Sequence, residues 1–245
     1  DSPLLVLRGS MAGPGGTFRI SGSGDIASRS GRVMLQSAAL ALSSELAANY
    51  HPRAGDLVAE FDAAGRLDEL SAWCEFAALA DRPEPRLDLG WKLAASDLRC
   101  DAPMFPYPIR GASLAVQGSS ADGGSAAFRF EHNDDDGRLE ARGELRELFR
   151  GSPHGELGVT ASSVRVGPKV GRALTRIPEA RRVWDAFSPT TGEADAELRL
   201  LLQGGEATPD FTMDLTMRGV AARFVGFVAE DGTRVDGIPL ALTDV

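Results

Sequence analysis

The chain has 245 residues, 43% of them hydrophobic, which is enough for one large β domain or two ordinary ones. Its formal net charge of -9 argues against nucleic-acid binding, because a protein needs a basic surface to displace counterions from phosphates. The same charge disfavours attachment to an anionic membrane surface by electrostatics alone. We therefore expect no nucleic-acid partner.

Strand patterns dominate the sequence. Apolar and polar residues alternate over Leu87–Leu93, Leu139–Leu145, Ala194–Leu202 and Phe211–Arg218, as in strands with one apolar and one wet face. Turn sequences such as Asp134–Gly137 separate the strands and predict antiparallel hairpins or a meander. Helical patterns long enough to connect parallel strands are absent, which argues against a Rossmann-like or α/β-barrel enzyme. We therefore predict a mainly β protein.

Helical spacing of apolar residues is confined to two places. It covers Leu42–Phe61 and Val170–Phe187, although Leu57–Ala63 also alternates in a way that permits a strand. We expect Pro178 to kink or divide the second helical segment, and Ser188–Pro189 to end it. Each segment is short and leads into a strand, which predicts a helical corner in a β protein.

The chain contains an internal repeat, which suggests a modular architecture. The segment Leu87–Cys100 returns in the same phase as Phe211–Phe224, 124 positions later. Upstream, Leu5–Gly9 is similar to Leu114–Gly118. We predict tandem units, each with one helical corner, and expect the chain to be a segment of a longer protein. The predicted units are residues 1–112, truncated at the N-terminus, and residues 113–245, truncated at the C-terminus.

The sequence offers little catalytic or metal-binding chemistry. His132–Gly137 begins like an EF-hand calcium loop, but histidine replaces the first carboxylate and the twelfth position is Gly143, so we interpret it as an acidic hairpin tip. No histidine has metal-ligand spacing to another histidine or cysteine, and no serine nucleophile elbow or phosphate-binding loop is present. Cys74 and Cys100 either pair or remain buried thiols. We expect no enzyme activity, no cofactor and no metal site.

Three segments carry a resemblance to a known family. The first, Ile177–Leu198, reads as a short helix with Trp-Asp, followed by Pro and Gly and then an acidic and apolar strand. The second, Phe105–Leu114, begins Phe-Pro-Tyr-Pro. The third, Gly237–Val245, is a degraded second example of the Phe105–Leu114 phrase. These phrases resemble those of AsmA-like and repeating-β-groove envelope proteins, especially the large planctomycete-type AsmA-like proteins. The resemblance implies a long, twisted, open antiparallel sheet with an apolar concave face that conducts phospholipid. It also implies a periplasmic location in a bacterial envelope, and a full-length protein that contacts membranes through an anchor elsewhere.

The physics of hydrocarbon burial fits such a conduit. Each CH₂ removed from water contributes about 0.8 kcal/mol, so a carrier needs a continuous apolar strip rather than a few polar anchors. Alternating strands provide that strip, and small residues such as Ala194 and Ala196 leave room on it for phospholipid or another acyl lipid. The residues predicted to line the groove are Leu87, Leu89, Trp91, Leu93, Leu198, Leu200, Phe211, Met213, Leu215 and Met217.

The alternative function is a structural or adhesive β-repeat scaffold of the cell envelope. The same alternation describes the closed core of a β-sandwich or barrel, which a scaffold would have. A conduit has an open sheet whose exposed apolar patch exceeds the roughly 300 to 600 Å² found on ordinary monomers. The two functions therefore differ in whether the apolar face is open.

Overall fold

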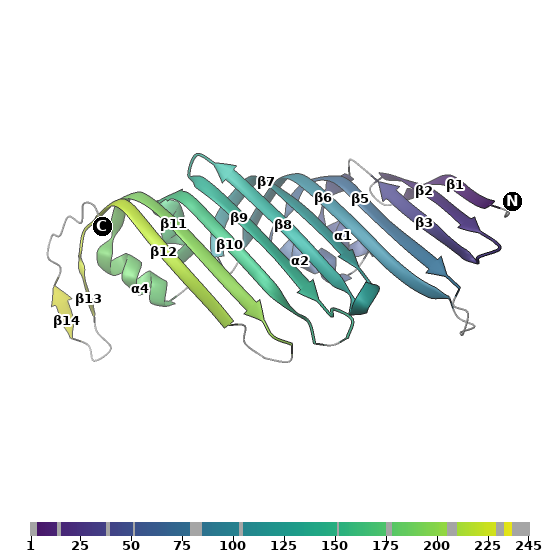
Figure 1. Ribbon diagram of the computed structural model, residues 1–245. Helices are drawn as coiled ribbons and strands as arrows, with labels where there is room; N and C mark the ends of the chain where they lie inside the picture. The colour runs from purple at the N-terminus through teal and green to yellow at the C-terminus, as the bar shows by residue number, and fades with distance from the viewer. Residues whose placement is uncertain are drawn as a thin grey trace.

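The computed structural model describes residues 4–13, 16–37, 40–50, 52–78, 85–102, 105–150, 152–174, 178–204, 210–228 and 233–236. Most of these residues lie in long strands that cross the molecule side by side (Figure 1). The strands are β1 (Leu4–Gly13), β2 (Gly16–Asp25), β3 (Ser30–Ser37), β4 (Leu40–Leu42), β5 (Ala64–Ala77), β6 (Arg86–Ala102), β7 (Phe105–Ser119), β8 (Ser125–Asp134), β9 (Gly137–Arg146), β10 (His154–Arg165), β11 (Pro189–Leu202), β12 (Asp210–Ala222), β13 (Gly226–Val228) and β14 (Arg234–Asp236).

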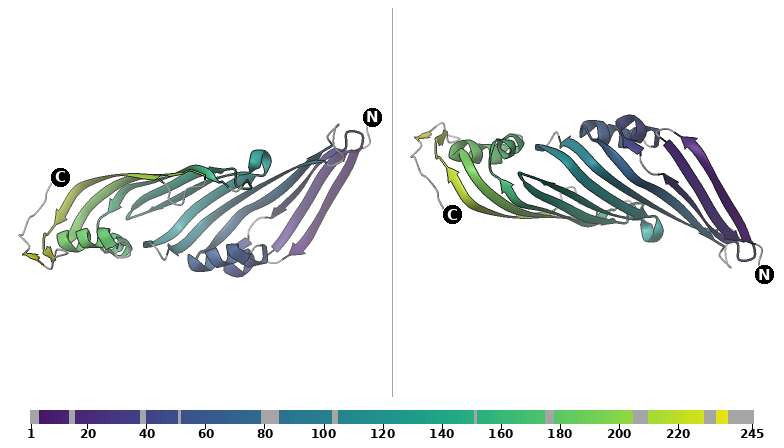
Figure 2. Two further views of the ribbon diagram at one scale, coloured as in Figure 1. Left: turned by 90° about the horizontal axis from the view of Figure 1, so that it is seen from below. Right: turned by 90° about the horizontal axis from the view of Figure 1, so that it is seen from above.

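One antiparallel meander accounts for the architecture. Within the described residues, the strands from β1 to β12 form a 12-stranded sheet in chain order, with β4 placed beyond the end of β3 against β5. The two outermost strands of this described sheet, β1 and β12, each pair on one side only, so the sheet is open. It twists along its length rather than closing on itself (Figure 2). The predicted fold, a long open antiparallel sheet in a mainly β protein, is confirmed.

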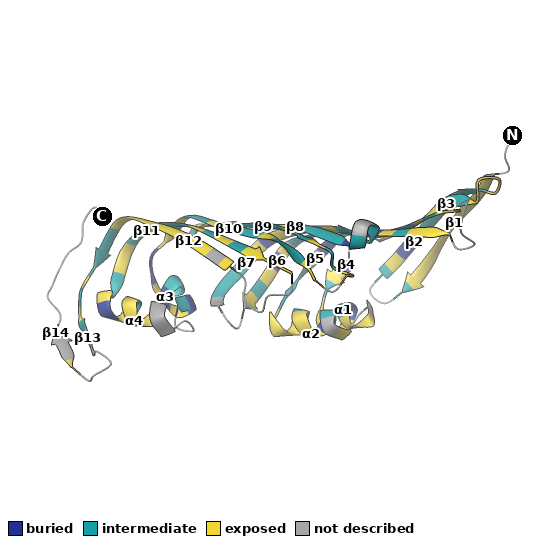
Figure 3. Ribbon diagram, turned by 60° about the horizontal axis from the view of Figure 1, so that its bottom comes forward, coloured by how far each residue is buried: buried dark blue, intermediate teal, exposed yellow. Residues whose placement is uncertain are grey.

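The helices form two corners on one face of the sheet (Figure 3). The first corner, α1 (Ser44–Tyr50) and α2 (Pro52–Glu60), connects β4 to β5, and the second, α3 (Pro168–Leu174) and α4 (Pro178–Phe187), connects β10 to β11. Both lie where helical spacing predicts them. Pro178 starts α4, a position where its missing N–H breaks no helical hydrogen bond. None of the described helices is long and apolar enough to cross a membrane.

The cross-strand register sorts the side chains onto two different faces. A continuous row of paired residues runs over eight strands and is apolar throughout, so we name its side the apolar face. The helical corners lie on this face, because Leu46 of α1 belongs to the same buried cluster as residues of the row. From β5 to β12 the row consists of Leu67, Ala95, Leu114, Phe130, Ala141, Val159, Leu198 and Met213.

The opposite side, which we name the charged face, carries parallel rows of acidic and basic residues. The register pairs Glu131 with Glu140 and Arg129 with Arg142 on neighbouring strands. Like charges directly opposite one another repel, but each arginine forms an ion pair within its own strand, Arg129 with Glu131 and Arg142 with Glu140. On β11, Arg199 and Glu197 repeat the arrangement. The charged face is therefore solvent-exposed, and ion pairs within single strands offset the repulsion between like charges on neighbouring strands.

A buried cluster fills the first helical corner. Leu46 of α1 packs there against Leu40 of β4 and Leu67 of β5, each at most 5% exposed. Burial of such side chains contributes about 1.5 to 3 kcal/mol each, which fixes α1 and α2 on the sheet. The other buried members of the cluster are Phe18, Ala95, Leu98 and Ala112.

The repeat is visible in the order of elements. A helical corner follows β1 to β4 in the first unit and β8 to β10 in the second, and two strands follow each corner. The series match because β3 and β4 together pair with β5 as the single strand β10 pairs with β11. In this order β8 is the counterpart of β1, whereas the sequence similarity of Leu5–Gly9 to Leu114–Gly118 aligns β1 with β7. Alternating strands resemble one another closely enough to be matched one strand out of step. The predicted boundary between residues 112 and 113 lies inside β7, which pairs with β6 and β8 on its two sides.

Candidate functional site

The register places all of the predicted lining residues on the apolar face. The rows run from Leu93 through Val116 and Phe128 to Leu200, so the β6 group and the β11–β12 group share one surface. For Phe211 only the backbone, which pairs with Leu200, is described. Within this shared surface, Leu87, Leu89, Met213, Leu215 and Met217 are exposed, whereas Trp91, Leu93, Leu198 and Leu200 are half-buried.

Aromatic side chains cover two glycine positions on this surface. The ring of Trp91 covers Gly118 on the neighbouring strand, and the ring of Phe128 covers Gly143. A Cβ at either glycine would clash with the ring, so both positions need glycine for the close approach. Apolar side chains therefore cover both glycines on the floor between the two groups of predicted lining residues.

A groove lies between this floor and the second helical corner. Its volume is about 900 Å³, within the range of pockets that hold small organic molecules. Apolar side chains of α3 and α4 form its roof, namely Val170, Leu174, Val183, Trp184 and Phe187. The floor comes from β9 to β12 and includes Leu139, Ala161, Val164, Ala194, Ala196, Met213, Leu215 and Met217.

Only part of the predicted lining lies in the groove. Met213, Leu215 and Met217 line it, as do the small residues Ala194 and Ala196. The residues predicted on β6 lie outside the groove on the open part of the apolar face, and Leu198 and Leu200 also lie beyond its lining. Sequence reasoning missed the roof: the helical spacing of Val183 and Phe187 had indicated a helix, but not what that helix covers.

One end of the groove is polar. His132 of β8 lines it and is 2% exposed, and neither of its ring nitrogens makes a hydrogen bond. Its Nε2 lies 3.3 Å from Oδ2 of Asp134, without hydrogen-bond geometry. Tyr107 of β7 also lines this end, and burial raises the pKa of its phenol.

The acidic hairpin tip beside His132 is neutralised by basic residues. Lys169 of α3 donates a hydrogen bond to Asp136, which lowers the pKa of that carboxyl group, and lies 3.7 Å from Asp134. Arg165 lies 3.6 Å from the other oxygen of Asp136. Asp134 also accepts a hydrogen bond from the backbone N–H of Asp136 at 2.9 Å. The hairpin interpretation therefore holds, and the tip is tied to α3.

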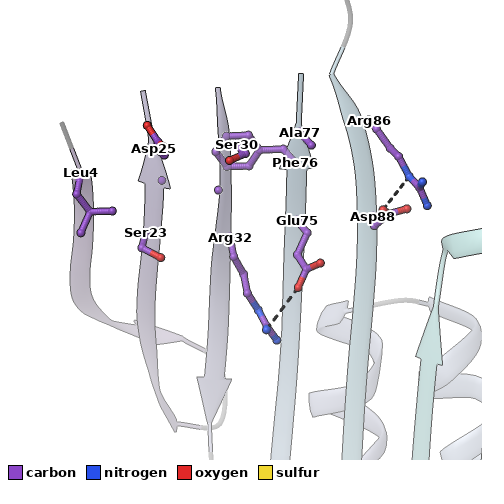
Figure 4. Close-up of a pocket in the computed structure, with 12 residues that line it drawn as sticks. Leu4, Ser23, Asp25, Ser30, Arg32, Glu75, Phe76, Ala77, Arg86 and Asp88 are labelled. Carbon is purple, nitrogen blue, oxygen red and sulfur yellow. Dashed lines mark ion pairs between the residues drawn. The ribbon is translucent and has the colours of Figure 1, made fainter. Parts of the chain in front are cut away.

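Two further hollows have a different character. One has a volume of about 470 Å³ and is lined by residues of strands between β1 and β6 (Figure 4). Arg32 pairs with Glu75 there, and Arg86 pairs with Asp88. The other, of about 1140 Å³, has charged residues such as Arg199 in its lining. The arginines of the first are already paired and the second is lined by charged residues, so neither hollow resembles the apolar groove as a ligand site.

The cysteines take no part in the groove. Cys74 and Cys100 are free thiols, both half-buried, which settles the open choice between a bridge and two thiols. Burial raises the pKa of Cys100 and disfavours its reactive thiolate.

Comparison with known proteins leaves the family of the chain open. The AsmA-like resemblance rests on the quoted segments, of which Gly237–Val245 lies outside the described residues. Searches against protein-family models, curated proteins and solved structures give no match.

Proposed function

We propose that this chain holds the hydrocarbon chain of a lipid in the groove under α3 and α4, and passes such chains along the apolar face without covalent chemistry. The observation that carries the proposal is the groove itself, whose roof and floor are almost entirely apolar. Hydrocarbon gains free energy from such a surface in proportion to the area it removes from water. The role we propose for the parent protein is phospholipid or other acyl-lipid transport in the periplasm of a bacterial envelope.

The open apolar face supports movement rather than storage alone. Exposed apolar side chains on this face occur on both sides of strands β7 to β11, namely Leu87 and Leu89 on β6 and Met213 on β12. Half-buried apolar residues connect these ends through the paired rows. Methionine is flexible at three side-chain bonds and adapts to chains of different shape. A lipid leaving the groove would meet apolar surface in either direction.

The alternative, an envelope scaffold, is favoured by the filled first corner, where Leu40, Leu46 and Leu67 make an ordinary protein core. A scaffold gains stability from burying its apolar residues. The exposure of Met213 (56%) and Leu215 on the floor of the groove opposes this function. We therefore rank the conduit above the scaffold.

The test is native mass spectrometry of the purified protein, with extraction and identification of whatever lipid it carries. We expect co-purified lipid at defined stoichiometry, lost in the double variant Met213→Asp/Leu215→Asp, because buried carboxylates are costly beside hydrocarbon. Thr212→Asp is the matched control, since Thr212 lies on the same strand but on the charged face. A folded, lipid-free protein that also takes up neither added phospholipid nor an added uncharged acyl lipid would overturn the proposal.

A further inference from the structure

The most unusual group in the groove is the imidazole of His132. A buried polar group normally has a hydrogen-bond partner, and leaving one without a partner destabilises the fold. His132 is 2% exposed, faces the apolar floor through its pairing with Leu139, and has no hydrogen bond at either ring nitrogen. The equivalent position in the first unit is Met11, which pairs with Phe18 as His132 pairs with Leu139. Met11 is apolar and 48% exposed on the outermost strand β1, so the burial of a polar group without a hydrogen bond at this position is particular to the second unit.

We infer that His132 binds the uncharged, hydroxyl-bearing polar end of the lipid whose hydrocarbon chain occupies the groove. The inference rests on the proposed function, and it names the ligand class. Either ring nitrogen can form a hydrogen bond with a hydroxyl group, because a hydroxyl both donates and accepts. A hydroxyl at this end of the groove would satisfy the ring without bringing a charge into an apolar site.

The surroundings of His132 argue against a charged headgroup. The carboxylate of Asp134 lies 3.3 Å from Nε2, so an anionic phosphate or carboxylate bound at the ring would be repelled. Lys169 does not compensate such an anion, because its ammonium is already engaged by Asp136 and Asp134. A cationic headgroup would compete with Lys169 and Arg165 for the same carboxylates. An uncharged hydroxyl avoids both conflicts.

The position of His132 also sets the direction of the hydrocarbon chain. From His132 on β8 the paired row continues through Leu139, Ala161 and Ala196 to Leu215 on β12. Four spacings between neighbouring strands make this path about 19 Å long, enough for a long acyl chain lying across the strands. The two alanines in the middle of the row have small side chains, which leave space for the hydrocarbon chain between the floor and the helices. The polar end therefore lies beside α3 and the hydrocarbon end points towards Met213 and Leu215.

The experiment compares 1-tetradecanol, tetradecane and myristate as competitors of the uncharged fluorescent probe N-phenyl-1-naphthylamine. For the wild-type protein we expect tetradecanol to bind about tenfold more tightly than tetradecane, the effect of one buried hydrogen bond, and more tightly than myristate. His132→Leu should remove the preference for the alcohol while keeping tetradecane binding. His154→Leu is the matched control, because His154 lies on β10 outside the groove lining.

A second measurement needs no variant. With ¹⁵N-labelled histidine, tetradecanol should shift the ring nitrogens of His132, and tetradecane should shift them much less. Equal binding of alcohol and alkane, tighter binding of myristate, or a preference that persists in His132→Leu would overturn the inference while leaving the groove intact. Failure of both tetradecane and tetradecanol to bind the wild-type protein would overturn the proposed function as well.

Discussion

The two helical corners have the same topology, yet one is filled and the other holds a groove. Each consists of two short helices inserted between strands at the same place in the repeat, with Leu40 paired to Leu67 in the first and Val164 paired to Ala194 in the second. At four equivalent positions the second corner has the smaller side chain. These positions, first corner before second, are Phe18 and Leu139, Leu40 and Val164, Leu46 and Val170, and Leu67 and Ala194.

This difference shows how one backbone plan serves as a core or as a ligand site. Protein interiors are close-packed, so removing several methyl and methylene groups from one region leaves space unless the backbone collapses. One position changes in the other direction: Ala95, the partner of Leu67, matches Met217, the partner of Ala194. This match by strand pairing differs by two residues from the sequence repeat, which aligns Met217 with Leu93. Met217 is exposed and lines the groove rather than filling it. Side-chain volume at a few positions, not topology, therefore distinguishes the two corners.

The largest expected effect comes from hollowing the filled corner. Leu67→Ala removes a side chain that is 5% exposed and leaves a cavity beneath α1. We expect the free energy of unfolding to fall by about 2 to 5 kcal/mol, measured by denaturant titration. Leu89→Ala is the control, because Leu89 is 53% exposed and its truncation should cost about 0.5 kcal/mol or less. Equal losses in the two variants would show that the first corner is not a packed core.

Filling the groove should have the next largest effect, on binding rather than on folding. Ala161→Leu combined with Ala194→Leu places two larger side chains on the floor below α3 and α4. We expect tetradecane affinity to fall at least about tenfold, or about 1.4 kcal/mol, measured by probe displacement. Thr212→Leu, on the charged face, should leave affinity unchanged. Undiminished binding in the filled variant would place the hydrocarbon site elsewhere.

Replacing the buried histidine should stabilise the second corner. His132→Leu removes a polar group without hydrogen bonds and substitutes the kind of side chain that the equivalent Met11 provides. We expect the free energy of unfolding of the lipid-free protein to rise by about 1 kcal/mol, measured by denaturant titration. His154→Leu should change it by less than about 0.5 kcal/mol. A clear loss of stability in His132→Leu would mean that the ring has a partner in solution.

The smallest effect concerns the ion pair that ties the β8–β9 turn to α3. The hydrogen bond from Lys169 lowers the pKa of Asp136 in the folded protein below its ordinary value of 3.8. A lowered folded-state pKa stabilises the fold above pH 3.8, and this contribution disappears as the pH falls through the folded-state value. Lys169→Met should therefore flatten this part of the pH dependence, measured as melting temperature between neutral and acidic pH. An unchanged acid slope would show that the pair does not form in solution.

Alternation in the sequence predicted the two faces correctly, because a strand has a fixed period of two residues. From that pattern alone, Leu198 and Met213 were placed on one side, and the structure pairs them directly. The helical corners were predictable for a similar reason, since apolar spacing and Pro178 are local signals. Antiparallel order and corner positions therefore follow from short-range patterns. The openness of the sheet does not, because alternation also describes a closed core, and only the family resemblance implied it.

The location of the groove was not predictable, because it depends on contacts between residues far apart in the sequence. Val164 and Ala194 are both ordinary strand residues, and only their pairing under α3 leaves the space. The sequence predicts that His132 belongs to an acidic hairpin tip, and it does not predict that the ring is buried. His132 is 2% exposed on a strand that pairs with β7, against which α3 packs, and no local pattern records this arrangement.

The ion pairs within single strands on the charged face have an evolutionary consequence. Arg142 and Glu140, or Arg199 and Glu197, neutralise one another without help from an adjacent strand. A gene duplication or deletion that adds or removes a hairpin of such strands would therefore leave no unbalanced charge beside it, whereas loss of a strand with a cross-strand pair, such as Lys92–Glu69 or Arg218–Asp195, would. Such self-contained strands allow the sheet to lengthen or shorten in whole hairpins, so the span of the molecule can evolve separately from the chemistry of its groove.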